Sequence, residues 1–393
     1  MSKLFLVTNP GSSSRKYALY RDDALVCSLH FEFEGKDVVC TLKTPDGAKQ
    51  KLTGFKKLTD TVEYVQRILT DQGYLSAQSE LSAILARVVA AGEYFTADHL
   101  VDDECLRQLE IAKARTPLHV PVVAAEISAC LKVFQGTPVI IISDSAFHAT
   151  RDAVHTNYAI DQDLARRAEI KRYGFHGLSV GSIAHYLDQH QLAADKVIVC
   201  HLGSGSSVTA LKSGQSFDTT MGYTPLEGLM MATRCGDIDP AAALAIGREL
   251  KLQGDDLEAY LNKKCGFLGV TGTTDDLREV ISLRDDGDPK AKLAYDLFIY
   301  RVQRAIGQMA ASLNGADALV FTATIGERNA AIRRDIISGL SYLNFKVNDT
   351  KNADGLGDQS HCLISGRTSN PIYVILTDET GEMIRRARTL LDR

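Results

Sequence analysis

A short turn near the start of this 393-residue chain combines glycine, serine and a positive charge. These groups bind phosphate through backbone N–H, hydroxyl and ammonium donors. The turn covers residues 9–16, NPGSSSRK, and offers Ser12, Ser14 and Lys16 as candidate phosphate ligands. Asn9 adds an oxygen that suits a metal-bound water. The G-x-x-x-x-G-K-[ST] pattern is absent and a strand follows, so this is not a Walker loop. A polar hairpin tip without a ligand is the alternative interpretation.

A second turn, HLGSGSS at residues 201–207, offers the same donors. Two such tips facing each other can hold the two ends of one polyphosphate. A third segment with a glycine, residues 321–327, can close the site over a nucleoside. An ordinary turn between a strand and a helix is the alternative for this third segment.

One charged side chain lies where an α/β fold can present it to a ligand. Asp144 ends the apolar strand expected over residues 139–143, the position at which α/β folds expose functional groups. A helix N-cap is the alternative for Asp144. We expect His148, four residues on, to serve packing or capping rather than catalysis.

Two more candidates sit in glycine-rich surroundings. His176 lies between two glycines, whose flexible backbone permits close approach to a ligand. Arg234 is a cation in the Gly-, Thr- and Met-rich segment 218–240, and its planar guanidinium can grip a phosphoryl group. A structural histidine and a salt-bridge anchor are the respective alternatives.

These residues require a scaffold, and the hydrophobic pattern predicts an α/β fold. Strand–turn–strand units at residues 3–20 and 196–211 indicate an internal duplication. The duplication predicts two lobes with a cleft between them. The first lobe comprises residues 1–148 and is completed by residues 379–393, and the second comprises residues 149–378. Helices are expected over residues 59–71, 122–134, 179–190, 240–250, 255–263, 291–313 and 382–391, and strands over 81–89, 139–143, 318–322 and 372–376.

Composition excludes several classes of protein. The 44 Lys and Arg residues against 49 Asp and Glu residues give a net charge of −5, without the basic excess of a nucleic-acid-binding protein. No segment suits a signal peptide or a membrane span, so we expect a cytoplasmic location and no membrane partner. The eight cysteines occur singly, without C-x-x-C, which predicts reduced, mostly buried thiols rather than a disulfide framework or zinc site.

Taken in chain order, these segments resemble the acetokinase family, the acetate and propionate kinases of the sugar kinase, Hsp70 and actin superfamily. The matching segments are NPGSSSRK at 9–16, TPLH at 116–119, DSAFH at 144–148, RYGFHG at 172–177, HLGSGSS at 201–207, DTTMGYTPLEGLMM at 218–231, TRCGDIDP at 233–240 and TDE at 377–379. The resemblance implies an α/β fold of two duplicated actin-like (ribonuclease H-like) lobes with a central cleft. It also implies reversible phosphoryl transfer between ATP and acetate, giving ADP and acetyl phosphate, by a homodimer with Mg²⁺ or Mn²⁺.

The same resemblance assigns roles to matching positions. Catalysis falls to Asp144, His176 and Arg234. Acyl-substrate contacts fall to Arg87, Val89, Leu118, His119, Phe175 and Pro225. Nucleotide contacts fall to Ser12, Ser14, Lys16, His201, Leu202, Gly203, Ser204, Gly205, Asp276, Leu277, Arg278, Thr324, Ile325, Gly326, Glu327 and Arg328. Metal-associated positions are Asn9 and Glu379.

The sequence departs from the family pattern most clearly in the nucleotide segment, where GGIGEN is replaced by ATIGER at residues 323–328. We hypothesise that Thr324 and Arg328 reshape adenosine binding, which leaves weakly bound ATP, another nucleotide or pyrophosphate as donors, unless neighbouring changes compensate. The branched Val89 favours acetate over propionate by about 1–3 kcal/mol, the value of one methylene. A propionate kinase and a catalytically inactive sensor of acyl phosphate or nucleotide are the rival interpretations.

Overall fold

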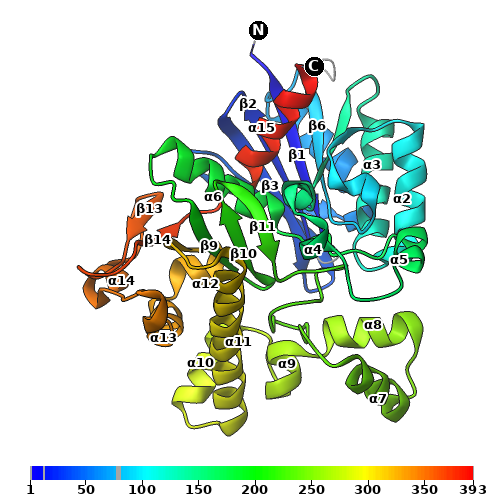
Figure 1. Ribbon diagram of the computed structural model, residues 1–393. Helices are drawn as coiled ribbons and strands as arrows, with labels where there is room; N and C mark the ends of the chain where they lie inside the picture. The colour runs from blue at the N-terminus through cyan, green and yellow to red at the C-terminus, as the bar shows by residue number, and fades with distance from the viewer. Residues whose placement is uncertain (1, 12–13, 77–80, 393) are drawn as a thin grey trace. The chain divides into compact units, whose positions relative to one another are not determined.

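The computed structural model describes residues 2–11, 14–76 and 81–392, so Ser12 lies outside the described residues. Its chain divides into two compact units, Met1–Ala146 with Glu379–Arg393, and Phe147–Asp378 (Figure 1). Each unit contains one β-sheet with helices packed on both faces.

The sheet of the first unit is built outward from the predicted N-terminal hairpin. In spatial order its strands are β5 (Lys49–Phe55), β4 (Asp37–Lys43), β3 (Ala24–Glu34), β2 (Ser14–Arg21), β1 (Leu4–Pro10), β6 (Ala83–Val88), β8 (Val139–Ser143) and β7 (His99–Leu100). Strands β1 and β2 are antiparallel, whereas β1, β6 and β8 are mutually parallel neighbours. The carboxyl ends of β1, β6 and β8 therefore meet at one sheet edge.

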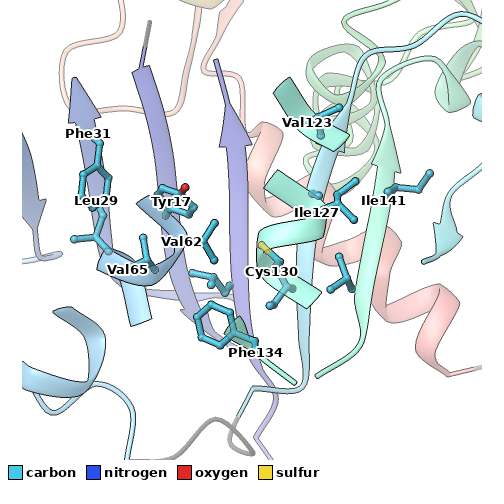
Figure 2. Packing of buried hydrophobic residues seen from close by; sticks show 14 of the residues in the cluster. Tyr17, Leu29, Phe31, Val62, Val65, Val123, Ile127, Cys130, Phe134 and Ile141 are labelled. Carbon is cyan, nitrogen blue, oxygen red and sulfur yellow. The ribbon is translucent and has the colours of Figure 1, made fainter. Parts of the chain in front are cut away.

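Alternation along the strands distributes apolar side chains to both faces of this sheet. Helices α1 (Thr61–Asp71) and α3 (Val120–Val133) cover one face, where Tyr17 and Phe31 pack with Val62 and Ile127 (Figure 2). Helix α15 (Glu379–Leu391) contacts β1, β6 and β8, and its Arg388 lies over the Phe5 ring. Helix α2 (Asp103–Arg115), which the sequence analysis did not predict, is capped by the Asp102 side chain.

The sheet of the second unit repeats the pattern of the first. Its strands, in spatial order, are β11 (Gln215–Thr219), β10 (Ser206–Lys212), β9 (Lys196–Leu202), β12 (Ala318–Thr322), β14 (Ile372–Ile375) and β13 (His361–Leu363). Strands β10, β9, β12 and β14 correspond to β2, β1, β6 and β8 in both order and direction. This correspondence confirms the predicted internal duplication.

Two separate apolar clusters cover the faces of the second sheet. Ile198 and Cys200 of β9 face the cluster of helix α11 (Pro289–Leu313), whereas Val197 and Val199 face helix α6 (Gly177–Gln189). The other helices of this unit are α4 (Ala153–Thr156), α5 (Gln162–Ala168), α7 (Pro240–Leu250), α8 (Gly254–Lys263), α9 (Gly266–Thr271), α10 (Leu277–Asp285), α12 (Ala323–Arg328), α13 (Ala330–Ser338) and α14 (Asp349–Asp354). Every predicted helix has a counterpart within three residues of its expected bounds. Within the described ranges, none of the helices is both long and apolar enough to span a bilayer.

Candidate active site

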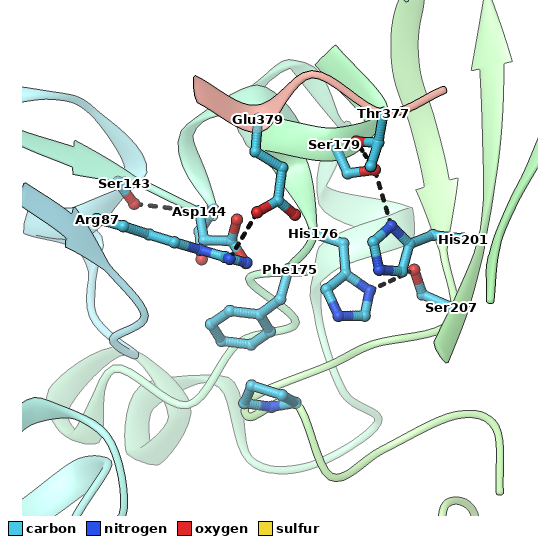
Figure 3. A network of polar contacts seen from close by, with 12 residues as sticks. Arg87, Ser143, Asp144, Phe175, His176, Ser179, His201, Ser207, Thr377 and Glu379 are labelled. Carbon is cyan, nitrogen blue, oxygen red and sulfur yellow. Dashed lines mark hydrogen bonds and ion pairs between the residues drawn. The ribbon is translucent and has the colours of Figure 1, made fainter. Parts of the chain in front are cut away.

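In the first unit, Arg87 joins two acidic side chains at the carboxyl edge of the sheet. Arg87 is the penultimate residue of β6, Asp144 directly follows β8, and Glu379 is the first residue of α15. One guanidinium nitrogen of Arg87 lies 3.2 Å from Asp144 and the other 2.8 Å from Glu379 (Figure 3). Three residues predicted to serve the site, from segments far apart in the sequence, are thus brought together.

The electrostatics of this cluster favour binding of further charged groups. Burial raises the pKa of the Glu379 carboxyl, and Arg87 acts against that shift. Burial lowers the pKa of the Arg87 guanidinium, but Asp144 and Glu379 more than compensate, so the net shift is upward. The buried Nε of Arg87 has no hydrogen-bond partner in the structure. Arg87 therefore stays charged, and its Nε is a hydrogen-bond donor that no described residue uses.

The N-terminal hairpin places its cation near the same cluster. Asn9 and Lys16 are cross-strand partners on β1 and β2, and both side chains are exposed. The Lys16 charge acts to lower the pKa of Glu379. The turn is closed by the N–H of Gly11, which donates to the Ser14 carbonyl at 2.9 Å. Asn9, Lys16 and Glu379 thus belong to one polar region of the first unit.

In the second unit, His176 is held in a constrained geometry. It has a left-handed φ of 60° at the start of α6, a conformation that costs free energy for a non-glycine residue and concentrates at functional sites. Its Nδ1 lies 2.9 Å from Ser207 Oγ, and its ring stacks on His201 with centroids 4.0 Å apart (Figure 3). His201 Nδ1 in turn contacts Ser179 Oγ at 2.7 Å.

The β9–β10 tip, residues 203–205, lies against His176 and Arg234. A Cβ placed on Gly205 would be 3.1 Å from His176 Nε2 and 3.5 Å from an Arg234 nitrogen. The N–H of Ala232 donates to the Ser204 carbonyl at 3.1 Å, which fixes the Arg234 loop to the tip. The tip, an imidazole and a guanidinium therefore converge within one unit.

Arg234 carries a charge that no carboxylate of the described residues neutralises. Its Nη1 contacts only the Pro225 carbonyl at 3.3 Å and the Met231 sulfur at 3.4 Å among the hydrogen-bond acceptors of the described residues. No carboxylate in the described part of the chain forms an ion pair with it, and burial lowers its pKa. A partly buried, unpaired arginine beside a Gly/Ser tip is prepared to bind an anion. The salt-bridge alternative for Arg234 is therefore wrong for the described residues.

Gly205→Ala tests whether this convergence matters. We expect the rate of the phosphoryl transfer that the sequence analysis predicts to fall by about 10–10²-fold, because the new methyl group displaces His176 from its position. The thermal midpoint should change little. The matched control is Gly366→Ala, whose added Cβ would meet its nearest atom at 3.5 Å. Equal rates for both variants would contradict the assigned role of the tip.

Comparison with known proteins agrees with this chemistry. The sequence profile of the Acetokinase family matches residues 4–386. This chain belongs to the acetokinase family. It is 40% identical over 384 residues to an acetate kinase of Clostridium botulinum strain Okra, covering 95% of this chain and 96% of that protein.

Solved acetokinase structures extend the comparison to the fold. The chain resembles a propionate kinase from Francisella tularensis with a TM-score of 0.89 and 34% identity over 98% of both chains. It resembles an acetate kinase from Porphyromonas gingivalis with a TM-score of 0.87 and 30% identity over the full length of both. The duplicated actin-like fold of these acetokinases is therefore also the fold of this chain.

The acetokinase nucleotide segment has a backbone feature that the sequence analysis did not address. The left-handed backbone conformation falls on Ala323, with φ 64°, whereas Thr324 is an exposed residue of α12. Glu327 accepts hydrogen bonds from the N–H groups of Ala323 at 2.9 Å and Thr377 at 3.0 Å. Glu327 thus holds the segment in place, and Ala323 is the position at which a glycine would relieve strain.

Several other residues that the sequence analysis singled out stabilise the fold of the second unit. Leu202 and Leu277 are buried in the apolar core of the second unit, so only their backbone can reach a ligand. Asp276 caps α10 and forms an exposed ion pair with Arg278. His148 is buried between Ser216 and the Phe175 carbonyl, which confirms its predicted packing role.

The residues predicted to contact the acyl substrate occur in each of the two units. Val89 and Leu118 are half-buried residues of the first unit, directly after β6 and before α3. Phe175 and Pro225 are buried residues of the second unit. His119 is the N-cap residue of α3, without a side-chain capping bond. Their joint role in substrate binding stays a prediction.

Some supporting residues were not predicted. Ser179 and Ser207 orient the two histidines, and both lie within or directly after matched motifs. Arg333 is fully buried and donates to the carbonyls of Gly326 and Glu327 at 2.9 Å each. Arg333 had no local signal, because a buried arginine that binds carbonyl groups has the same sequence pattern as an exposed one.

The acetokinase reaction needs a divalent metal ion, and the first unit has suitable ligands. Among the described residues no three His, Cys, Asp or Glu side chains form a metal cage. Mg²⁺ in phosphoryl-transfer sites is typically held by one or two carboxylates with phosphate and water oxygens. The oxygens of Asn9 and Glu379, with Asp144 nearby on Arg87, fit that requirement.

Proposed function

We propose that the protein is a reversible, Mg²⁺-dependent acetate kinase. The observation that carries this proposal is Arg234, a guanidinium beside the Gly/Ser tip and His176 that has no ion-pair partner among the described residues, in a chain of the acetokinase family. A carboxylate oxygen of acetate attacks the γ-phosphorus of ATP. The bond from that phosphorus to the ADP oxygen breaks, giving acetyl phosphate and ADP.

The proposed roles follow from the charges. Phosphoryl transfer needs in-line positioning and neutralisation of three equatorial oxygens, with little covalent chemistry. Arg234 and His176 supply positive charge and a hydrogen bond to the transferred group, and Arg87 binds the acetate carboxylate while Asp144 orients the Arg87 guanidinium. Asn9 and Glu379 would hold Mg²⁺, which shields the phosphate charge when bound. The β9–β10 tip and Lys16 bind the remaining phosphates.

One assay tests this proposal against its rivals. Acyl phosphate formation is measured with acetate, propionate and butyrate as acceptors and ATP, GTP and pyrophosphate as donors. We expect acetate with ATP to give the highest kcat/KM, with propionate lower by about 10-fold to 10²-fold because Val89 narrows the pocket. Preference for propionate or pyrophosphate would favour those rivals, and absence of any product would favour the sensor.

The raised pKa of Glu379 predicts a pH-dependent requirement for Mg²⁺. A protonated carboxyl cannot bind the metal, and burial keeps Glu379 protonated at pH values where an exposed glutamate is ionised. As pH falls from about 8 to about 5, the Mg²⁺ concentration for half-maximal rate should rise. Glu379→Gln should bind Mg²⁺ more weakly and lose this pH dependence. Parallel pH profiles for the two proteins would contradict the role of Glu379.

We also propose a homodimer formed through helix α7. This helix is largely apolar, yet Gly247 is its one buried residue, and Leu244 is 58% exposed. An apolar surface of this kind is typical of a protein interface. Leu244→Asp should shift the mass measured by light scattering from dimer to monomer, whereas Val154→Asp, at an 88% exposed position on α4, should not. A monomeric wild type would contradict the proposal.

We further propose that the protein acts in the cytoplasm. All eight cysteines lie in the described residues and all are free, with five of them buried. This is the state expected in a reducing compartment.

A further inference from the structure

Two cysteines that the proposed chemistry does not use lie together beside Arg234. Cys235 directly follows Arg234, and Cys265 is the N-cap residue of α9. The N–H of Cys265 donates to the Thr233 carbonyl at 3.0 Å, and the N–H of Cys235 donates to the Leu261 carbonyl at 3.1 Å. Both side chains line one surface cavity, and each influences the pKa of the other. These backbone hydrogen bonds hold the Cys265 segment against the loop that carries Cys235 and the proposed phosphoryl-binding arginine.

Both thiols are accessible from solvent. Each is partly exposed, and the two line the same surface cavity together with Lys264 and Arg301. Cys362 is the third partly exposed cysteine, and it lines a different cavity near α14. A small oxidant can thus reach Cys235 and Cys265, whereas the five buried cysteines are shielded from it.

The two sulfurs differ in character. The hydrogen bond from Cys235 lowers the pKa of the Cys265 thiol, although burial acts the other way. The same hydrogen bond, followed by burial, raises the pKa of the Cys235 thiol. The Cys235 sulfur also lies 3.2 Å from the Gly236 carbonyl, a second acceptor for its proton. Cys265 is therefore the better nucleophile, and Cys235 is placed to react second.

We propose that Cys235 and Cys265 form a reversible regulatory disulfide when a peroxide reaches the cavity, which then slows the kinase; the regulatory part rests on the proposed function. The Cys265 thiolate attacks the O–O bond of hydrogen peroxide, giving a sulfenic acid and, after protonation, water. Cys235 attacks that sulfur, loses its proton, and releases the second water. Two thiols are oxidised by two electrons and one peroxide is reduced to two waters. A dithiol reverses the reaction by exchange.

The Cys235–Cys265 disulfide would affect Arg234 because Cys235 is the next residue in the chain. Forming an S–S bond of about 2.05 Å requires both cysteines to adopt disulfide geometry, and we expect the backbone at Cys235 to shift with it. Arg234 is held only by the two long contacts to the Pro225 carbonyl and the Met231 sulfur among the described residues, and its guanidinium follows that shift. A displacement near 1 Å at such a group lowers turnover by about 10²-fold.

The test uses the reduced, full-length protein treated with hydrogen peroxide. Mass spectrometry should find a Cys235–Cys265 linked peptide and the loss of two hydrogens. Acetyl phosphate formation should fall by about 10-fold to 10²-fold and return with dithiothreitol. Cys235→Ser and Cys265→Ser should keep the basal rate and resist peroxide, while Cys362→Ser should behave as the wild type.

The outcomes separate this inference from the proposed function. Absence of the linked peptide overturns the disulfide, whatever the activity. A linked peptide with an unchanged rate, or equal inactivation of the serine variants, overturns the regulatory role. A reduced protein that makes no acyl phosphate overturns the proposed function but leaves the measurement of the disulfide standing.

Discussion

Replacing Arg234 with alanine should lower kcat for acetyl phosphate formation by about 10³–10⁵-fold, the range found for arginines that stabilise a phosphoryl transition state. The same change should leave the thermal midpoint unchanged or raise it. Arg234 makes only long contacts in the free protein, and no carboxylate in the described residues offsets the cost of burying its charge. The rate is measured with the coupled assay and the midpoint by circular dichroism.

The Arg234 result has a matched control in the same unit. Arg166 is also an arginine, but its side chain is 78% exposed and pairs with Asp163 on the surface. Arg166→Ala should retain the wild-type rate, because an exposed pair of this kind contributes little. A rate for Arg234→Ala within tenfold of the wild type would refute the proposed role, as would loss of folding.

Arg87→Met should lower the activity as Arg234→Ala does, but it should also lower the stability of the fold. Arg87 lies between Asp144, which is 1% exposed, and Glu379, so its removal leaves two neighbouring carboxylates without the guanidinium that contacts both. Breaking a buried ion pair in this way typically costs about 3–5 kcal/mol in the free energy of unfolding. We expect kcat/KM for acetate to fall by about 10³-fold in the same variant. Urea denaturation and the coupled assay measure the two effects.

A second substitution separates the electrostatic explanation from simple loss of packing. Without Arg87 the pKa of the Glu379 carboxyl in the folded state rises further above its unfolded value, so stability is lost as pH rises and regained on acidification. Asp144→Asn in the Arg87→Met background should restore part of the stability at neutral pH, but not the activity. The control is Arg107→Ala, which removes an exposed pair with Glu104. If acidification and Asp144→Asn have no effect, the electrostatic explanation is wrong.

The local pattern of apolar residues predicted many of the helices and strands. The helix over residues 291–313 was visible from its apolar spacing, and the strand over 139–143 from its continuous apolar run. Strands β3, β4 and β5 were missed, because they extend the edge of the sheet with a mixed pattern of buried and exposed residues. Strand order, which confirms the duplication, depends on pairing between distant segments.

The nucleotide segment holds one constraint that the sequence did not reveal. The hypothesis that Thr324 and Arg328 reshape adenosine binding stays a prediction, and the structure adds a left-handed conformation at Ala323. Thr324 and Arg328 are exposed on α12. A backbone angle depends on how β12 leads into α12, and residue type alone does not report it.

The sequence by itself determined the chemical inventory of this acetokinase and the family to which it belongs. Gly/Ser turns, motif order and the presence of Asp144, His176 and Arg234 were all visible in the order of residues. Only the tertiary structure decided which charges are paired: Arg87 has two carboxylate partners, whereas Arg234 has none in the described residues. The reason is physical, since pairing and desolvation depend on distances between segments separated by up to about three hundred positions, and no local pattern encodes them.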